Sequence, residues 1–175
     1  KIQIFFSCDA FGKEGEYVRT GLDLDVAIKN FEHILHHTGI EQAINSALTI
    51  PAVPGMPAMV KYINECNKIK PIYWSMMKAN QYEIGPREYL YPGIFGNHIN
   101  RWGLEEAVQM FDTNSYGYPD SVKVSHKQFM LGNIQEFKAR EPSLIRQKQF
   151  KIYLNELDRR RGTDWKNIYP QIWEL

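Results

Sequence analysis

The sequence has little cysteine and no long apolar run. Only two cysteines occur in 175 residues, Cys8 and Cys66, and they stand too far apart to form a CxxC pair or a Cys/His metal motif. We therefore expect two small core residues, no metal site, no disulfide framework and a reducing, cytoplasmic compartment. No apolar run approaches the roughly 20 residues that a membrane span needs, so no membrane partner is expected.

The sequence also has no excess of one sign of charge, because 21 Lys and Arg balance 20 Asp and Glu to leave a net charge of +1. Bulk charge therefore does not favour nucleic acid as a partner. The end of the chain is locally basic, with Arg159, Arg160, Arg161 and Lys166 close to Trp165, and a phosphate-binding role for this segment remains an alternative. The same cations also suit the carboxyl end of a helix.

Catalytic and metal motifs are missing as well. The sequence has no HExxH motif, no glycine-rich phosphate loop and no evident nucleophile and base pair. His33, His36 and His37 share one helical turn, but no second helix offers matching ligands, so we expect an exposed helix end there.

Residues 1–9 show the clearest secondary-structure pattern. Ile2, Ile4, Phe6 and Cys8 alternate with a second set of residues that ends in Ser7 and Asp9, which predicts a strand with one bulky face. Polar groups at the carboxyl end of a strand are typical of sites in α/β sheets and barrels.

Two further strands are predicted at 41–50 and 69–77, with helices at 23–39 and from 58 to about 67. The carboxylate of Asp23 or Asp25 is expected to cap the first of these helices. The order β-α-β-α-β with short connections predicts an α/β fold with three parallel strands. Residues 11–21 are expected to form a loop, and three prolines exclude regular structure from 51–57.

The remaining chain divides into two regions. Residues 79–100 are rich in Tyr, Pro, Gly and Asn, which predicts either a long loop or lid, or a connection packed on the core. Residues 101–175 form a helical C-terminal region packed on the same domain as 1–78. Its helices are expected at 101–111, from a capping Ser125 to 139, and from Pro142 to about 160.

The candidate site combines polar residues at the ends of the predicted strands. An arginine on the loop above them could hold a carboxylate bidentately. The candidates are Ser7, Asp9, Arg19, Asn45, Thr49, Tyr73 and Ser75.

Two stretches carry a family resemblance over nearly the whole chain. The run from Phe6 to Asp9, then Glu16 to Arg19, then Asn30 and Phe31, resembles the fourth strand and following helix of radical S-adenosylmethionine enzymes. The tail from Tyr153 to Asp164, followed by Tyr169 and Pro170, resembles the end of phage and marine bacterial twitch-domain members of that family.

The resemblance implies a partial TIM-like barrel of which this chain supplies the last three strands. By position it implies that Ser7, Arg19 and Asn45 contact S-adenosylmethionine, together with Asp9 and Ser46. In the family a [4Fe-4S] cluster cleaves this cofactor reductively and a 5'-deoxyadenosyl radical takes hydrogen from the substrate. The family's CxxxCxxC cluster motif is absent from this sequence, so we expect a cluster only in a full-length parent and no radical chemistry from this chain alone.

The chain begins inside a strand, which indicates a fragment and an unpaired strand edge. The expected partner is the missing N-terminal half or, through the first strand, a second copy of the chain. Two other functions remain open, a non-catalytic module for a small polar ligand and a nucleic-acid accessory protein using the basic helix. Neither the substrate nor any catalytic residue is predicted.

Overall fold

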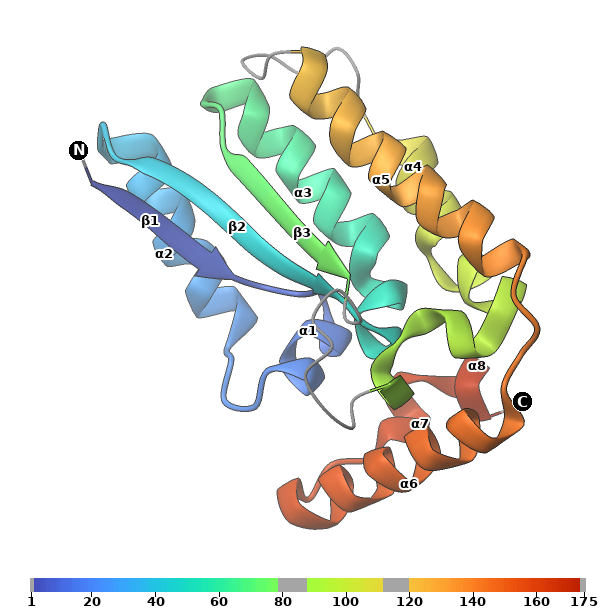
Figure 1. Cartoon of the computed structure of the whole chain (residues 1–175). Helices are drawn as coiled ribbons and strands as arrows, with labels where there is room; N and C mark the ends of the chain where they lie inside the picture. The colour runs from blue at the N-terminus through green and yellow to red at the C-terminus, as the bar shows by residue number, and fades with distance from the viewer. Residues whose placement is uncertain (1, 79–87, 112–119, 174–175) are drawn as a thin grey trace.

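The fold is built on a parallel three-stranded sheet. The computed structural model describes residues 2–78, 88–111 and 120–173. Its strands are β1 (Gln3–Ser7), β2 (Glu41–Leu48) and β3 (Tyr73–Lys78), in the spatial order β1-β2-β3 (Figure 1). The predicted parallel sheet is therefore confirmed, and most of the remaining described chain is helical.

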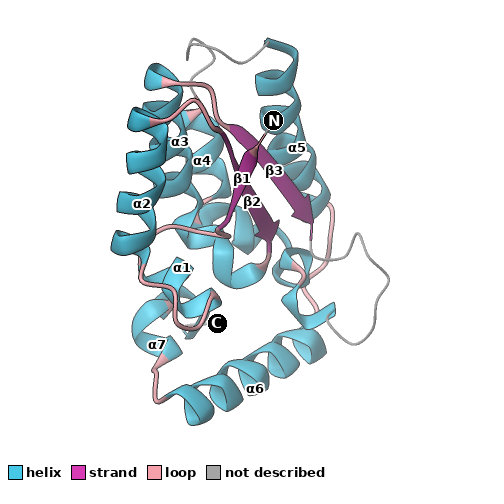
Figure 2. Cartoon of the chain, turned by 90° about the vertical axis from the view of Figure 1, so that its left-hand side faces the viewer, coloured by secondary structure: helices cyan, strands magenta, loops and turns pink. Residues whose placement is uncertain are grey.

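Helices cover one face of this sheet. The connections between strands contain α2 (Leu24–His37) and α3 (Met56–Ile69), which lie on the same side of the sheet (Figures 1 and 2). On that side Ile44, Leu48 and Trp74 are buried, whereas Phe5 and Tyr73 on the other face are 56% and 50% exposed. This asymmetry follows from the period of two along each strand. It is unusual for a parallel sheet, which normally has both faces covered.

The segment after β1 differs from the loop predicted for residues 11–21. It contains a short helix, α1 (Lys13–Val18), whose Gly15 lies against the preceding turn. A Cβ atom on Gly15 would stand 2.1 Å from the carbonyl oxygen of Ala10, so only glycine fits. Of the two caps predicted for the next helix, the structure has Asp23, whose side chain accepts a hydrogen bond from the backbone N–H of Val26 at 3.0 Å, and Asp25 lies in the first turn.

The prediction that residues 51–57 lack regular structure is wrong. A 3-10 helix, η1 (Ile50–Gly55), precedes α3 despite its two prolines. Pro51 occupies its first turn, where the missing N–H would have no partner in any case. The third strand also starts later than predicted, because α3 continues to Ile69.

Residues 88–102 are packed on the core. They form the 3-10 segments η2 (Glu88–Leu90) and η3 (Pro92–Trp102), in which Phe95 and Ile99 are fully buried. The described part of the predicted long loop is thus an ordered connection, while its residues 79–87 lie outside the described chain.

The C-terminal region is helical and joins the same hydrophobic core. It comprises α4 (Leu104–Met110), α5 (Asp120–Lys138), α6 (Leu144–Arg161), α7 (Trp165–Ile168) and α8 (Pro170–Trp173). Helix α5 begins before Ser125, so the predicted cap at that residue is wrong. The end of α6 is as expected, with Gly162 at its C-cap in the left-handed conformation, φ 68°. Within the described residues, no helix has the length and hydropathy required to cross a bilayer.

Candidate functional site

Three of the predicted site residues lie side by side on the uncovered face of the sheet. Ser7 pairs in register with Asn45, and Asn45 pairs with Ser75, so the three side chains form one line across the strands. We call Ser7, Asn45 and Ser75 the polar row. Among the described residues none of the three side chains makes a hydrogen bond, so their donors and acceptors are available to a ligand.

Asp9 and Arg19 pair with each other beside the carboxyl ends of the strands. Asp9 is buried, and its Oδ1 accepts a hydrogen bond from Nη2 of Arg19 at 3.2 Å and another from the backbone N–H of Ala47 at 2.7 Å. Nε of Arg19 lies 3.1 Å from Oδ2 of Asp9, too poorly aligned for a hydrogen bond. This pair ties the turn after β1 to β2, and a ligand carboxylate would have to share Arg19 with Asp9.

Ser46 does not join the polar row, although its neighbour Asn45 does. Adjacent strand residues point to opposite faces. The Ser46 hydroxyl is buried on the helix-covered face, where it donates to the carbonyl of Cys8 at 2.6 Å and accepts from Nε1 of Trp74 at 2.9 Å. Its contacts in the chain are those of a core residue.

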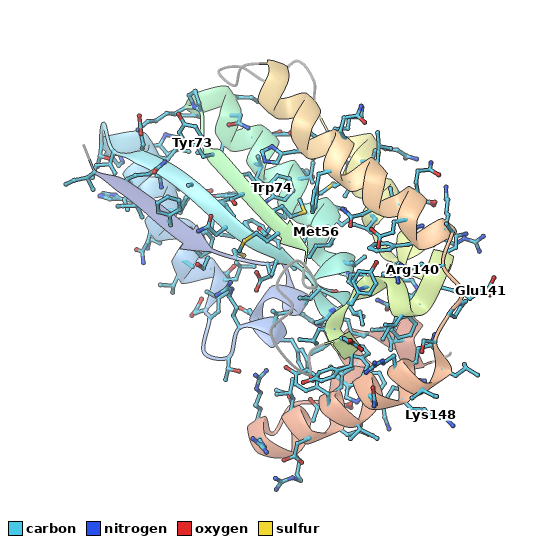
Figure 3. The ribbon with its side chains drawn as sticks, in the orientation of Figure 1. Met56, Tyr73, Trp74, Arg140, Glu141 and Lys148 are labelled. Carbon is cyan, nitrogen blue, oxygen red and sulfur yellow. The ribbon has the colours of Figure 1, made fainter. Side chains whose placement is uncertain are left out.

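Tyr73 and Thr49 flank the polar row at different distances. Tyr73 pairs with Ala43, so it lies two residues before Ser75 on the same face. Figure 3 labels Tyr73 beside Trp74, its neighbour on β3, of which only 5% is exposed. Thr49 follows the end of β2, and its Oγ1 is buried and makes no hydrogen bond to the part of the chain that the structure describes.

The cysteines do not fit an iron–sulfur cluster. Both are buried and free, and Sγ of Cys8 donates to the carbonyl of Ala10. Burial raises the pKa of Cys8 to about 12 and that of Cys66 to about 11, which favours neutral thiols over the thiolates that bind iron. In the part of the chain that the structure describes, no three His, Cys, Asp or Glu side chains gather at a possible metal site. His33, His36 and His37 therefore do not form one either.

The basic end is largely occupied by intramolecular contacts. Arg159 and Arg160 both pair with Glu156, at 2.8 and 2.6 Å, and their hydrogen bonds lower the pKa of Glu156 to about 2. Nη1 of Arg161 donates to the carbonyl of Tyr17. Fewer free cations therefore face a phosphate backbone than the sequence indicates.

Two cavities were missed by the sequence reasoning. The larger, about 510 Å³, lies between η2–η3 and the connection from α5 to α6, where Figure 3 shows Arg140 and Glu141. Its walls carry both signs of charge, and Arg146 pairs with Glu88 across it. The smaller, about 180 Å³, includes Thr49. Residues distant in sequence line each cavity, so no local pattern could have revealed them.

Comparisons with models of protein families, with curated proteins and with solved structures found no match for this chain.

Proposed function

We propose that this chain is the C-terminal half of a partial barrel of the radical S-adenosylmethionine type and contributes cofactor and substrate contacts to it. The observation that supports this best is the polar row on the uncovered face of a parallel sheet. In a barrel that face is the interior, where ligand contacts lie near the carboxyl ends of the strands. Serine hydroxyls and an asparagine amide suit the ribose and the amino-acid part of this cofactor.

The chain's own residues would act by binding and orienting. Asn45 stands at the centre of the polar row and can donate and accept at the same time. The Asp9–Arg19 pair holds the turn that borders the row. In the bound state the cofactor supplies the radical precursor, whereas the cluster that cleaves it would come from the part of the barrel that holds the cysteine motif.

Titration calorimetry with S-adenosylmethionine tests the binding role. We expect weak, saturable binding that Asn45→Ala weakens about fivefold to tenfold, the effect of one or two lost hydrogen bonds. Gln3→Ala is the matched control, because Gln3 is exposed on the same face at the other end of β1. Unchanged affinity in Asn45→Ala, or no binding at millimolar cofactor, would refute a cofactor site on this half.

The uncovered face and strand edges also support a completing partner. Among the described residues neither β1 nor β3 pairs with a fourth strand, and Phe5, Tyr73 and Met77 leave apolar surface exposed on the open face. We propose that the N-terminal strands of the parent barrel pair with β1, or that a second copy does so. Light scattering with hydrogen exchange tests this, because a monodisperse monomer whose β1 amides are fully protected would contradict it.

A ligand-binding module without catalysis is the second candidate, supported by the available groups of the same polar row. Salt separates it from the nucleic-acid alternative, since phosphate-backbone binding weakens steeply with added salt and binding of a small neutral ligand does not.

A further inference from the structure

The smaller cavity lies just beyond the carboxyl end of β2 and is lined by four segments of the chain. Its walls come from α1, from the start of η1, from η2 and from the middle of α6. Among the described residues, none of the lining side chains carries a charge. They are Tyr17, Val18, Thr49, Pro51, Leu90, Tyr153, Leu154 and Leu157.

Two charged residues that contact Tyr17 in the wall of this cavity, Asp158 and Arg161, already have hydrogen-bond partners. Asp158 accepts hydrogen bonds from the Tyr17 hydroxyl at 3.1 Å and from the backbone N–H of Trp165 at 2.7 Å. Arg161 is held by the carbonyl of Tyr17 at 2.8 Å. Among the described residues that line the cavity none offers a counterion, so entry of a charged ligand would be costly, whereas a neutral ligand would not meet that cost.

Thr49 gives the cavity one unsatisfied polar group. Its hydroxyl oxygen is shielded from solvent and has no hydrogen-bond partner among the described residues, an uncommon state for a buried polar atom. A 120° rotation about the Cα–Cβ bond brings the hydroxyl group of a threonine to the position that its methyl group held, while the methyl group moves to the position of the Cβ hydrogen. A ligand hydroxyl in the cavity could thus draw the Thr49 hydroxyl toward it and provide the missing partner.

The volume limits the size of the ligand. A cavity of about 150 Å³ lined by aliphatic and aromatic side chains holds one benzene molecule, and this one measures about 180 Å³. Thr49 also lies four residues beyond Asn45 in extended chain, which is about 13 Å at 3.3 Å per residue. The cavity is therefore separate from the polar row.

From these observations we propose that the cavity lined by Thr49 and Leu157 is a binding site for a neutral, single-ring aromatic alcohol. The ring packs among Val18, Leu154 and Leu157, and the ligand hydroxyl hydrogen-bonds to Oγ1 of Thr49. The proposal does not require S-adenosylmethionine binding, so the two can fail independently.

Phenol and toluene are the probes, since they differ by a hydroxyl in place of a methyl group. We would titrate the whole chain with each and follow the methyl resonances of Val18, Leu154 and Leu157 by NMR, with Ile94 in the larger cavity as the reporter of nonspecific binding. In Thr49→Val, which keeps the side-chain shape, we expect phenol to bind threefold to tenfold more weakly, as for one lost hydrogen bond. Toluene should bind equally well or more tightly.

A second variant tests the location. Leu157→Phe fills the cavity and should abolish binding of both probes, and Leu90→Trp fills it from the η2 side if Leu157→Phe does not fold. The proposal is overturned if neither probe gives saturable shifts in the unmodified chain. It is also overturned if Thr49→Val changes both affinities in parallel, or if both filled variants keep the binding.

Discussion

Replacing Asp9 by alanine tests whether the Asp9–Arg19 pair holds the turn after β1 on the sheet. The side chain of Asp9 is only 8% exposed and accepts from the Ala47 N–H and from Arg19. Truncation leaves the part-buried backbone donor of Ala47 without a partner, and an unsatisfied buried donor costs about 1–3 kcal/mol. The side chain of Arg19 is 38% exposed, so the lost ion pair adds at most about 1 kcal/mol after solvent screening.

We therefore expect Asp9→Ala to lower the free energy of unfolding by about 2–3 kcal/mol. For a chain of this size that corresponds to a decrease in Tm of roughly 4–12 °C. Urea denaturation followed by tryptophan fluorescence measures the change, because Trp74 and Trp165 are buried and report on the core.

Two further variants separate the hydrogen bond from the charge. Asp9→Asn keeps an oxygen acceptor for Ala47 and loses only the charge, so we expect a loss of about 1 kcal/mol or less. Asp25→Ala, an exposed carboxylate in the first turn of α2, should stay within about 0.5 kcal/mol of the parent. The reasoning is refuted if Asp9→Ala has no larger effect than Asp25→Ala, or if Asp9→Asn is as damaging as Asp9→Ala.

The remaining predictions concern close packing and the thiols. Gly103→Ala should cost more than about 2 kcal/mol in thermal unfolding, because its Cβ would lie 2.4 Å from the carbonyl oxygen of Val53, whereas Gly132→Ala in α5 meets nothing within 4 Å and should be neutral or stabilising. Equal effects of the two would contradict the packing at Gly103. Since burial raises the pKa of Cys8 to about 12 and of Cys66 to about 11, iodoacetamide at pH 8 should label neither thiol until urea unfolds the chain. Rapid labelling of the folded chain would contradict the raised pKa values of the two thiols. The free energy of unfolding should also fall above about pH 9, where the thiols of the unfolded chain lose protons that those of the folded chain keep.

The strand faces could be predicted from the sequence because their period is short and local. Alternation alone placed Ser7, Asn45 and Ser75 on one face, and the structure brings them into one line. The same rule separates Ser46 from Asn45, and a prediction made by family position overlooked it. The Asp23 cap could also be predicted from the sequence, because its hydrogen bond joins residues only three positions apart.

What could not be predicted depends on contacts between distant residues. The 3-10 helix η1 forms despite its two prolines, and its Gly55 lies against Phe11, where a Cβ would stand 2.4 Å from the carbonyl oxygen. The pairing of Arg19 with Asp9 and the cavity around Thr49 likewise appear only once the chain is folded. Local secondary-structure propensity does not depend on contacts between residues that are distant in sequence, so it cannot predict them.

The contacts of α1 with the end of the chain have a consequence for synthesis on the ribosome. Tyr17 is held by Asp158 and Arg161, and the second of these follows it by 144 positions. At 5–20 residues per second, roughly 7–30 s separate the appearance of Tyr17 from that of Arg161. During that interval β2 and η1 can already pack on β1 and α1, but the Tyr17 side of α1 stays uncovered because its neighbours lie on α6 and at Tyr169. A chaperone that binds nascent chains would find its main opportunity there, and a stop codon before α6 would make that exposed state permanent.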